Sequence, residues 1–165
     1  MKIVQIIPAF LTATMIMIGC STESNNEAEN GNNASGIIRL SGEDTSAVGT
    51  ELEVGDIDYG RVDLTGLEDS IIIVHKGVTI SEESIVDAFD SENGFVIVAG
   101  EQVISMTIVT DGVQRQYACD STFGTFTDCN DISINEDSNE AVFTNTTVQN
   151  VETGSILTMN GTLRW

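Results

Sequence analysis

From residue 36 onward, apolar residues alternate with polar ones in short runs, and Gly, Asp, Asn and Ser separate these runs. Val, Ile and Thr dominate the runs, and residues with a branched Cβ favour extended backbone. Short runs with turn residues at regular intervals are typical of an all-β domain. We therefore predict a small antiparallel β-sandwich or a Greek-key-like barrel. The predicted strands are 37–41, 51–54, 61–64, 70–75, 94–99, 103–110, 113–119, 131–135, 140–148 and 155–165.

The clearest local signal is Asp111-Gly112, which lies between two alternating runs. A two-residue type I′ turn favours this dipeptide because both of its residues need positive φ. Such a turn pairs Thr110 with Val113, and this fixes the register of the whole hairpin. One face of the hairpin is then apolar, and we predict that it lies in the core: Ile104, Met106, Ile108, Tyr117 and Cys119.

The last predicted strand shows the same alternation at the end of the chain. Its apolar and polar residues fall on opposite faces, so one face should be buried. The apolar residues are Leu157, Met159, Leu163 and Trp165, and the polar ones are Thr158, Asn160, Thr162 and Arg164.

One segment departs from the strand pattern and predicts a short helix near residues 81–89. Ser81 is a favourable N-cap residue, and Glu82 and Glu83 place negative charge in the first turn. The apolar residues that follow have a spacing that allows one helical face: Ile85, Val86 and Phe89.

The first residues of the chain do not alternate. An apolar run from Ile3 to Ile18, broken by a few polar residues, ends at Gly19 directly before Cys20. The run is short for a membrane span, and polar sequence follows it at once. Met17-Ile18-Gly19-Cys20 resembles the lipobox of bacterial lipoprotein signal peptides, with Met17 where Leu is commoner.

This resemblance implies how the chain is processed and where it resides. Residues 1–19 would be the signal peptide, and Cys20 would carry a diacylglyceryl group on its sulfur and an acyl group on its amine. Two or three acyl chains make a stable membrane anchor. Because Ser21 rather than Asp follows the cysteine, the resemblance implies the outer membrane, on its periplasmic side or surface, in a Gram-negative organism. An ordinary secretory signal with a coincidental cysteine is the alternative.

Residues 20–35 consist of this cysteine and a stretch rich in Asn, Glu and Ser. The stretch has no aromatic or aliphatic β-branched residue, so it buries too little apolar surface to offset the entropy of ordering. We expect a flexible tether that spans about 20 Å on average. Residues 36–165 then form a single all-β domain.

The charge of the chain excludes one class of partner. It carries 26 acidic and six basic residues, a net charge of −20. Such a surface repels the phosphates of nucleic acids and the headgroups of anionic lipids. Nucleic-acid binding is therefore excluded, and we expect the membrane to be held through acyl chains alone.

Cys119 and Cys129 remain as an even pair once Cys20 is taken as the lipid site. Disulfides persist in exported proteins, and closing this short loop would stabilise the fold by roughly 2–3 kcal/mol. A metal site is the rival interpretation, but two cysteines and one distant histidine make a poor zinc site. The loop holds Phe123 and Phe126, which either form an apolar tip that touches a partner or fold back onto the domain.

His75 is the only histidine, which limits catalysis. A catalytic triad assembles in space and needs no local motif, but no Gly-x-Ser-x-Gly nucleophile elbow occurs. Acidic clusters at 56–58, 128–131 and 136–140 offer oxygen ligands for Ca²⁺. None has the Asp-x-Asp-x-Asp-Gly pattern, and each also suits a turn. The sequence thus predicts neither a catalytic residue set nor a cofactor or metal site.

Two function classes remain open. The favoured one is a lipid-anchored binding or structural module without enzymatic activity, which meets an envelope protein or a glycan. The alternative is a small extracytoplasmic hydrolase or metal-dependent enzyme that uses His75 or an acidic cluster. An enzyme should place His75 beside Ser, Asp or Glu in a concave pocket, whereas a binding module should expose an apolar or aromatic patch. The sequence indicates no particular oligomeric state.

Overall fold

The computed structural model describes residues 34–83, 85, 91–122, 124 and 126–165. All of them belong to one structural unit, Gly31–Trp165. They form a nine-stranded antiparallel sheet with two helical turns, α1 (Thr45–Val48) and α2 (Val62–Thr65). The strands are β1 (Ile37–Gly42), β2 (Glu51–Tyr59), β3 (Ser70–His75), β4 (Gly94–Gly100), β5 (Val103–Thr110), β6 (Val113–Asp120), β7 (Ile132–Asn135), β8 (Glu140–Asn150) and β9 (Ile156–Arg164).

Eight of these strands close into an antiparallel barrel, which confirms the predicted all-β fold. β1 pairs with both β2 and β9, and β6 pairs with the end of β8 through Tyr117 and Ala118. β7 lies outside the closed ring because, among the described strands, it pairs with β8 alone. Neighbours in the barrel are otherwise consecutive in the chain, so the connectivity is up-and-down rather than Greek-key.

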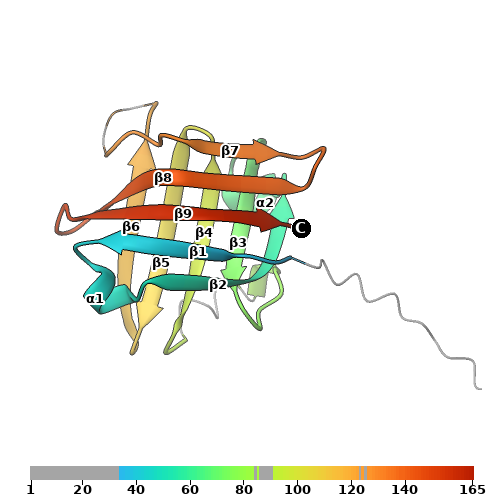
Figure 1. The fold of residues 1–165 in the computed structure, drawn as a ribbon. Helices are drawn as coiled ribbons and strands as arrows, with labels where there is room; N and C mark the ends of the chain where they lie inside the picture. The colour runs from blue at the N-terminus through green and yellow to red at the C-terminus, as the bar shows by residue number, and fades with distance from the viewer. Residues whose placement is uncertain (1–33, 84, 86–90, 123, 125) are drawn as a thin grey trace, which may run out of the picture. The chain divides into compact units, whose positions relative to one another are not determined.

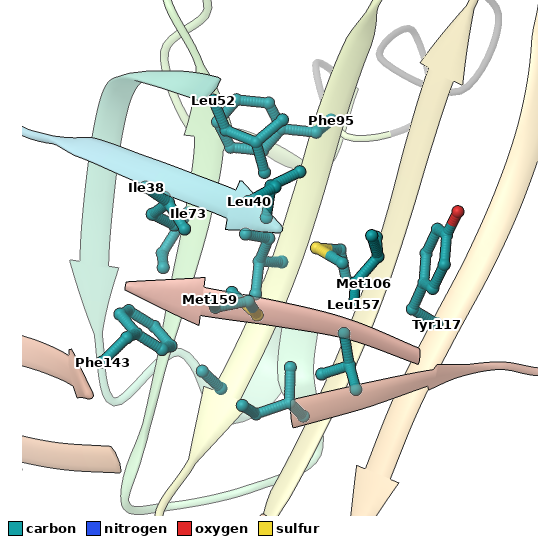
Figure 2. Packing of buried hydrophobic residues seen from close by; sticks show 14 of the residues in the cluster. Ile38, Leu40, Leu52, Ile73, Phe95, Met106, Tyr117, Phe143, Leu157 and Met159 are labelled. Carbon is teal, nitrogen blue, oxygen red and sulfur yellow. The ribbon is translucent and has the colours of Figure 1, made fainter. Parts of the chain in front are cut away.

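The barrel is flattened into two layers that share one core. In Figure 1, β7, β8, β9, β1 and β2 run across the front, and β3 to β6 cross behind them. Side chains of the two layers meet between them and fill the interior, as expected for a small barrel. Figure 2 shows this packing, in which Leu40, Leu157 and Met159 come from the front layer and Ile73, Met106 and Tyr117 from the back.

The Asp111-Gly112 hairpin has the predicted register along its whole length. Both turn residues have positive φ, 52° at Asp111 and 71° at Gly112, as a type I′ turn requires. The alternation predicted for the last strand is confirmed as well, with Leu157, Met159 and Leu163 fully buried. The predicted apolar face of the hairpin lies in the core: Ile104, Met106, Ile108, Tyr117 and Cys119.

The strand predicted at 61–64 is wrong, because this segment is the helical turn α2. The N–H groups of Leu64 and Thr65 both donate to the carbonyl of Arg61, at 2.9 Å. Gly66 ends the turn in the left-handed conformation, with a φ of 73°. Two apolar residues in so short a segment suit a strand and a helical turn equally well, so alternation alone does not distinguish them.

β2 continues well past the strand predicted at 51–54. A bulge at Gly55 shifts the register of β2 against β3. A Cβ atom at this position would collide with the backbone of β3, so only glycine fits. Beyond the bulge, Ile57 faces the core, and by alternation Asp56 and Asp58 face outward.

β3 is apolar on both faces, and both faces are buried. Its outward-facing residues Ile72 and Val74 form a second cluster with Val96 of β4. Asp56 lies buried beside this layer and holds it in place, since its carboxylate accepts hydrogen bonds from the N–H groups of Ile57 and Ile80, each at 2.9 Å. The residues that cover the cluster come from α2 and from the β3–β4 connection: Leu64, Val78, Ile80 and Ile85.

The short helix predicted near 81–89 falls in this connection. Glu82, Glu83 and Ile85 are helical, and the N–H of Ile85 donates to the carbonyl of Ser81 at 3.2 Å. Residues 84 and 86–90 lie outside the described residues.

Candidate binding site at one end of the barrel

The barrel has two ends, which the chain builds differently. The α1 end holds α1 together with the β3–β4, β5–β6 and β8–β9 connections. The α2 end holds α2, the β4–β5 hairpin, the segment 121–139 between β6 and β8, and the residues 34–36 that precede β1.

At the α1 end, Asp44 links elements that lie far apart in the chain. Its Oδ2 accepts hydrogen bonds from Tyr117 Oη at 2.9 Å, Asn150 Nδ2 at 3.0 Å and Ser155 Oγ at 2.7 Å. The bond from Ser155 lowers the pKa of Asp44 most, and the other two bonds and the charge of Arg115 lower it further, against the opposing effect of burial. Burial, together with the bond to Asp44, raises the pKa of Tyr117 to about 12. This network links the start of α1 to β6 and to the β8–β9 connection.

His75 also lies at the α1 end, where it lines a shallow depression of about 310 Å³. Its Nδ1 accepts a hydrogen bond from the backbone N–H of Phe95 at 3.4 Å. Glu53 lines the same depression, but its carboxylate pairs with Lys76 at 2.6 Å. The Nδ1 atom of this histidine is therefore hydrogen-bonded to the backbone, and the nearby carboxylate forms an ion pair with a lysine.

The acidic clusters that the sequence offers as calcium ligands have other roles in the structure, since Asp56 is buried in β2 and accepts backbone hydrogen bonds, and other members lie in turns or ion pairs. In the part of the chain that the structure describes, no group of three or more His, Cys, Asp or Glu side chains is placed to hold a metal ion. Asp58 pairs with Arg61 at 3.0 Å. Asp131 and Asn139 have positive φ, 57° and 49°, a conformation that Asp and Asn tolerate in turns.

Cys119 and Cys129 are joined by a disulfide in the structure, with their Cα atoms 5.2 Å apart, which fits the predicted pairing. Both residues are buried. The loop that they close is tied further by the N–H of Asp120, which donates to the carbonyl of Thr127 at 2.9 Å. This loop belongs to the α2 end and contributes Thr122 to the depression found there.

Several predicted features fall outside the described residues. Cys20, the signal sequence 1–19, nearly all of the tether, and Phe123 are among them, whereas Phe126 is described and half-buried. No described helix has the length and apolar character needed to cross a membrane.

A larger depression, of about 680 Å³, lies at the α2 end. Two segments line it, residues 66–69 after α2 and residues 100–103 of the β4–β5 hairpin, together with the side chains of Tyr59, Thr122 and Ile134. Its size is within the range of ligand sites. The residues that line it come from distant parts of the chain, and no local motif marks them.

This depression is negatively charged. Glu68, Asp69 and Glu101 line it, and no lysine or arginine is among the described residues that do. The five basic residues from Arg39 onward face other acids. Their partners are Glu51 for Arg39, Asp58 and Asp63 for Arg61, Glu53 for Lys76, Glu140 for Arg164, and Asp44, through its charge, for Arg115. The depression therefore has a field that attracts cations.

Tyr59 brings apolar surface into this acidic site. Its Oη donates a hydrogen bond to Asp69 Oδ1 at 3.3 Å. Partial burial raises the pKa of Tyr59, and the nearby charges of Asp69 and Glu136 raise it further, so the phenol stays protonated at neutral pH. With Leu67 and Ile134, the tyrosine ring gives the depression an apolar component beside its carboxylates.

Comparison with known proteins finds no matching family model, no matching curated protein and no matching solved structure.

Proposed function

We propose that this chain is an exported lipoprotein, held at the cell envelope through acyl chains on Cys20, whose barrel is a binding module. The proposed binding surface is the depression at the α2 end. The observation that carries the proposal is the contrast between a barrel interior filled with side chains and a depression lined by three carboxylates and, within the described part of the chain, by no basic residue. A ligand therefore has its place at the mouth of the barrel rather than inside it.

The alternative, a small hydrolase or metal-dependent enzyme, receives less support. The Nδ1 atom of His75 is occupied by the backbone of Phe95, and the carboxylate of Glu53 in the same depression is paired with Lys76. A general base needs a free nitrogen within hydrogen-bond reach of a substrate proton. A binding module needs only a recess with complementary charge, which the α2 end supplies.

Intact mass spectrometry of the protein from its native membrane fraction tests the anchor. The expected mass is that of residues 20–165 plus acyl chains, with two cysteines that are alkylated only after reduction. The Cys20→Ser variant should leave the membrane fraction and lose the added mass. An unlipidated protein from the native fraction would overturn the anchor.

Site-specific photo-crosslinking in cells tests the binding surface. A photoreactive residue at Gln102, in the depression, should give a discrete adduct with an envelope component, and one at Ser46, in α1, should not. The adduct should weaken when Glu68 and Glu101 are both changed to Gln. Equal adducts from Gln102 and Ser46, or an adduct that ignores the two glutamates, would contradict the proposal.

A further inference from the structure

β7 is an edge strand beside the acidic depression. Among the described strands it pairs with β8 alone, so its other side has no strand partner. In Figure 1 it is the outermost strand of the front layer, near the ends of the strands behind. Ile134 of β7 lines the depression together with the β4–β5 hairpin.

The hydrogen-bond pattern shows which backbone groups face the open side. The N–H of Thr144 in β8 donates to the carbonyl of Asp131 at 2.9 Å, in the same register that pairs Ile132 with Phe143. Backbone groups in an antiparallel strand alternate between its two sides. Asp131 faces β8, so the N–H and C=O groups of Ile132 and Ile134 face the open edge.

The side chains of these two isoleucines do not cover the open edge, because both pack against the barrel core. Ile132 and Ile134 are partly buried, and Ser133 and Asn135 between and after them are exposed. A short edge of this kind offers main-chain donors and acceptors. An extended peptide can form hydrogen bonds with these groups and add a strand to the sheet.

Charge decides which peptide fits. An added strand next to β7 would continue the front layer, and it would lie near the depression because Ile134 of β7 lines that depression together with Glu68, Asp69 and Glu101. Lys or Arg at alternate positions of that strand would then face these carboxylates. A second copy of this chain fits poorly, because two molecules of net charge −20 would bring their acidic ends together.

We propose that the α2 end binds an extended, basic segment of an envelope protein, which adds a strand to the open edge of β7 and sets its cationic side chains over the depression. This inference rests on the proposed binding function and names the class of its partner. Main-chain hydrogen bonds to Ile132 and Ile134 would supply binding, and the three carboxylates would supply selectivity.

Calorimetric titration of the full lipoprotein, purified in a nonionic detergent, tests this with synthetic peptides. The probe is a peptide of about eight residues that alternates Lys and Thr, with blocked ends. Two matched peptides are compared with it, one with Glu in place of Lys and one with N-methyl groups on alternate backbone amides. We expect the Lys peptide to bind, the Glu peptide not to bind, and methylation to weaken binding about tenfold by removing edge hydrogen bonds.

Variants of the protein separate charge from main-chain pairing. Glu68→Gln with Glu101→Gln should weaken binding of the Lys peptide about fivefold, because both side chains are exposed and line the depression. Glu43→Gln with Glu152→Gln changes the net charge equally at exposed positions of the α1 end, and binding should stay within about twofold. Amide NMR signals of Ile132 and Ile134 should shift and become protected from exchange when the Lys peptide is bound.

The outcomes also distinguish this inference from the proposed function. If the methylated peptide binds as tightly as the Lys peptide, binding depends on charge and not on main-chain hydrogen bonds, and strand addition is overturned. No binding of any peptide, with the Gln102 adduct retained, would overturn the basic-peptide partner while the binding module stands. Dimerisation of the protein alone through β7, seen by sedimentation, would assign the edge to a second copy instead.

Discussion

The two ends of the barrel handle negative charge in opposite ways. At the α1 end, Asp44 accepts three side-chain hydrogen bonds and faces Arg115, so its charge is stabilised by groups from three parts of the chain. At the α2 end, Glu68 and Glu101 line a depression whose described lining includes no basic residue. Hydrogen bonds between side chains of separate elements stabilise a fold, whereas uncompensated surface charge attracts ligands. The end with the hydrogen-bond network is therefore expected to contribute more to stability, and the other end carries the proposed binding surface.

Removing the carboxylate of Asp44 should give the largest loss of stability. Asp44→Ala leaves Tyr117 Oη and Asn150 Nδ2 without their acceptor in nearly buried side chains. We expect the free energy of unfolding, measured with urea, to fall by about 3 kcal/mol. Asp69→Ala at the α2 end loses one bond, at 3.3 Å, from Tyr59, and should cost less than about 0.5 kcal/mol. Equal losses at the two ends would refute the comparison.

At the α2 end, the disulfide between Cys119 and Cys129 constrains the loop that follows β6. Changing both Cys119 and Cys129 to Ala should lower the free energy of unfolding by roughly 2–3 kcal/mol, through the larger entropy of the unfolded chain. Native-state hydrogen exchange should then speed up at Asp120, whose N–H bonds to Thr127 within the loop. Exchange at Asn150 and Val151, at the α1 end, should not change. A loss of protection at both ends would show that the ends are not independent.

The pH dependence of stability should also depend on the α1 end. The pKa of Asp44 is lowered in the folded state from its ordinary value of 3.8, so its contribution to stability is complete above that pH and is lost as the pH falls below it. The pKa of Tyr117 is raised to about 12 from 10.0, so its contribution is complete below pH 10 and is lost as the pH rises towards 12. Asp44→Asn should flatten the acid limb and Tyr117→Phe the alkaline limb, each measured by urea unfolding across the pH range. If the limbs keep their slopes in these variants, other groups control them.

Sequence patterns predicted the parts of the fold that depend on neighbours in the chain. The Asp111-Gly112 turn sets its own register because both residues adopt positive φ, and the alternation beyond it follows. Alternation failed at 61–64, where glycines flank a segment too short to show a period. Alternation also gave too short a strand, because the close approach of β3 requires a bulge at Gly55 and the sequence of β2 does not indicate this bulge.

The sites depend on distant residues, and for that reason they escaped sequence reasoning. The partners of Asp44 lie 73, 106 and 111 positions away along the chain. Glu68 and Glu101 belong to none of the acidic clusters that the sequence marks, and the pairing of β3 with β4, in which Ser70 lies opposite Gly100, brings their two loops together. The cysteine pairing could be predicted because counting the cysteines of a chain that is expected to be exported requires no knowledge of the fold.

The smallest expected change in the free energy of unfolding has opposite signs at the two ends of the barrel. Glu68→Gln with Glu101→Gln removes two like charges that face no cation, so the free energy of unfolding should rise by up to about 0.5 kcal/mol. Glu51→Gln with Glu53→Gln removes the same charge at the α1 end but breaks the pairs with Arg39 and Lys76. The free energy of unfolding should therefore fall by about 0.5 kcal/mol. Both changes should shrink in 1 M salt because these groups are exposed. A gain at both ends would mean that net charge alone governs stability, and that the carboxylates of the α2 end are not distinguished by their lack of partners.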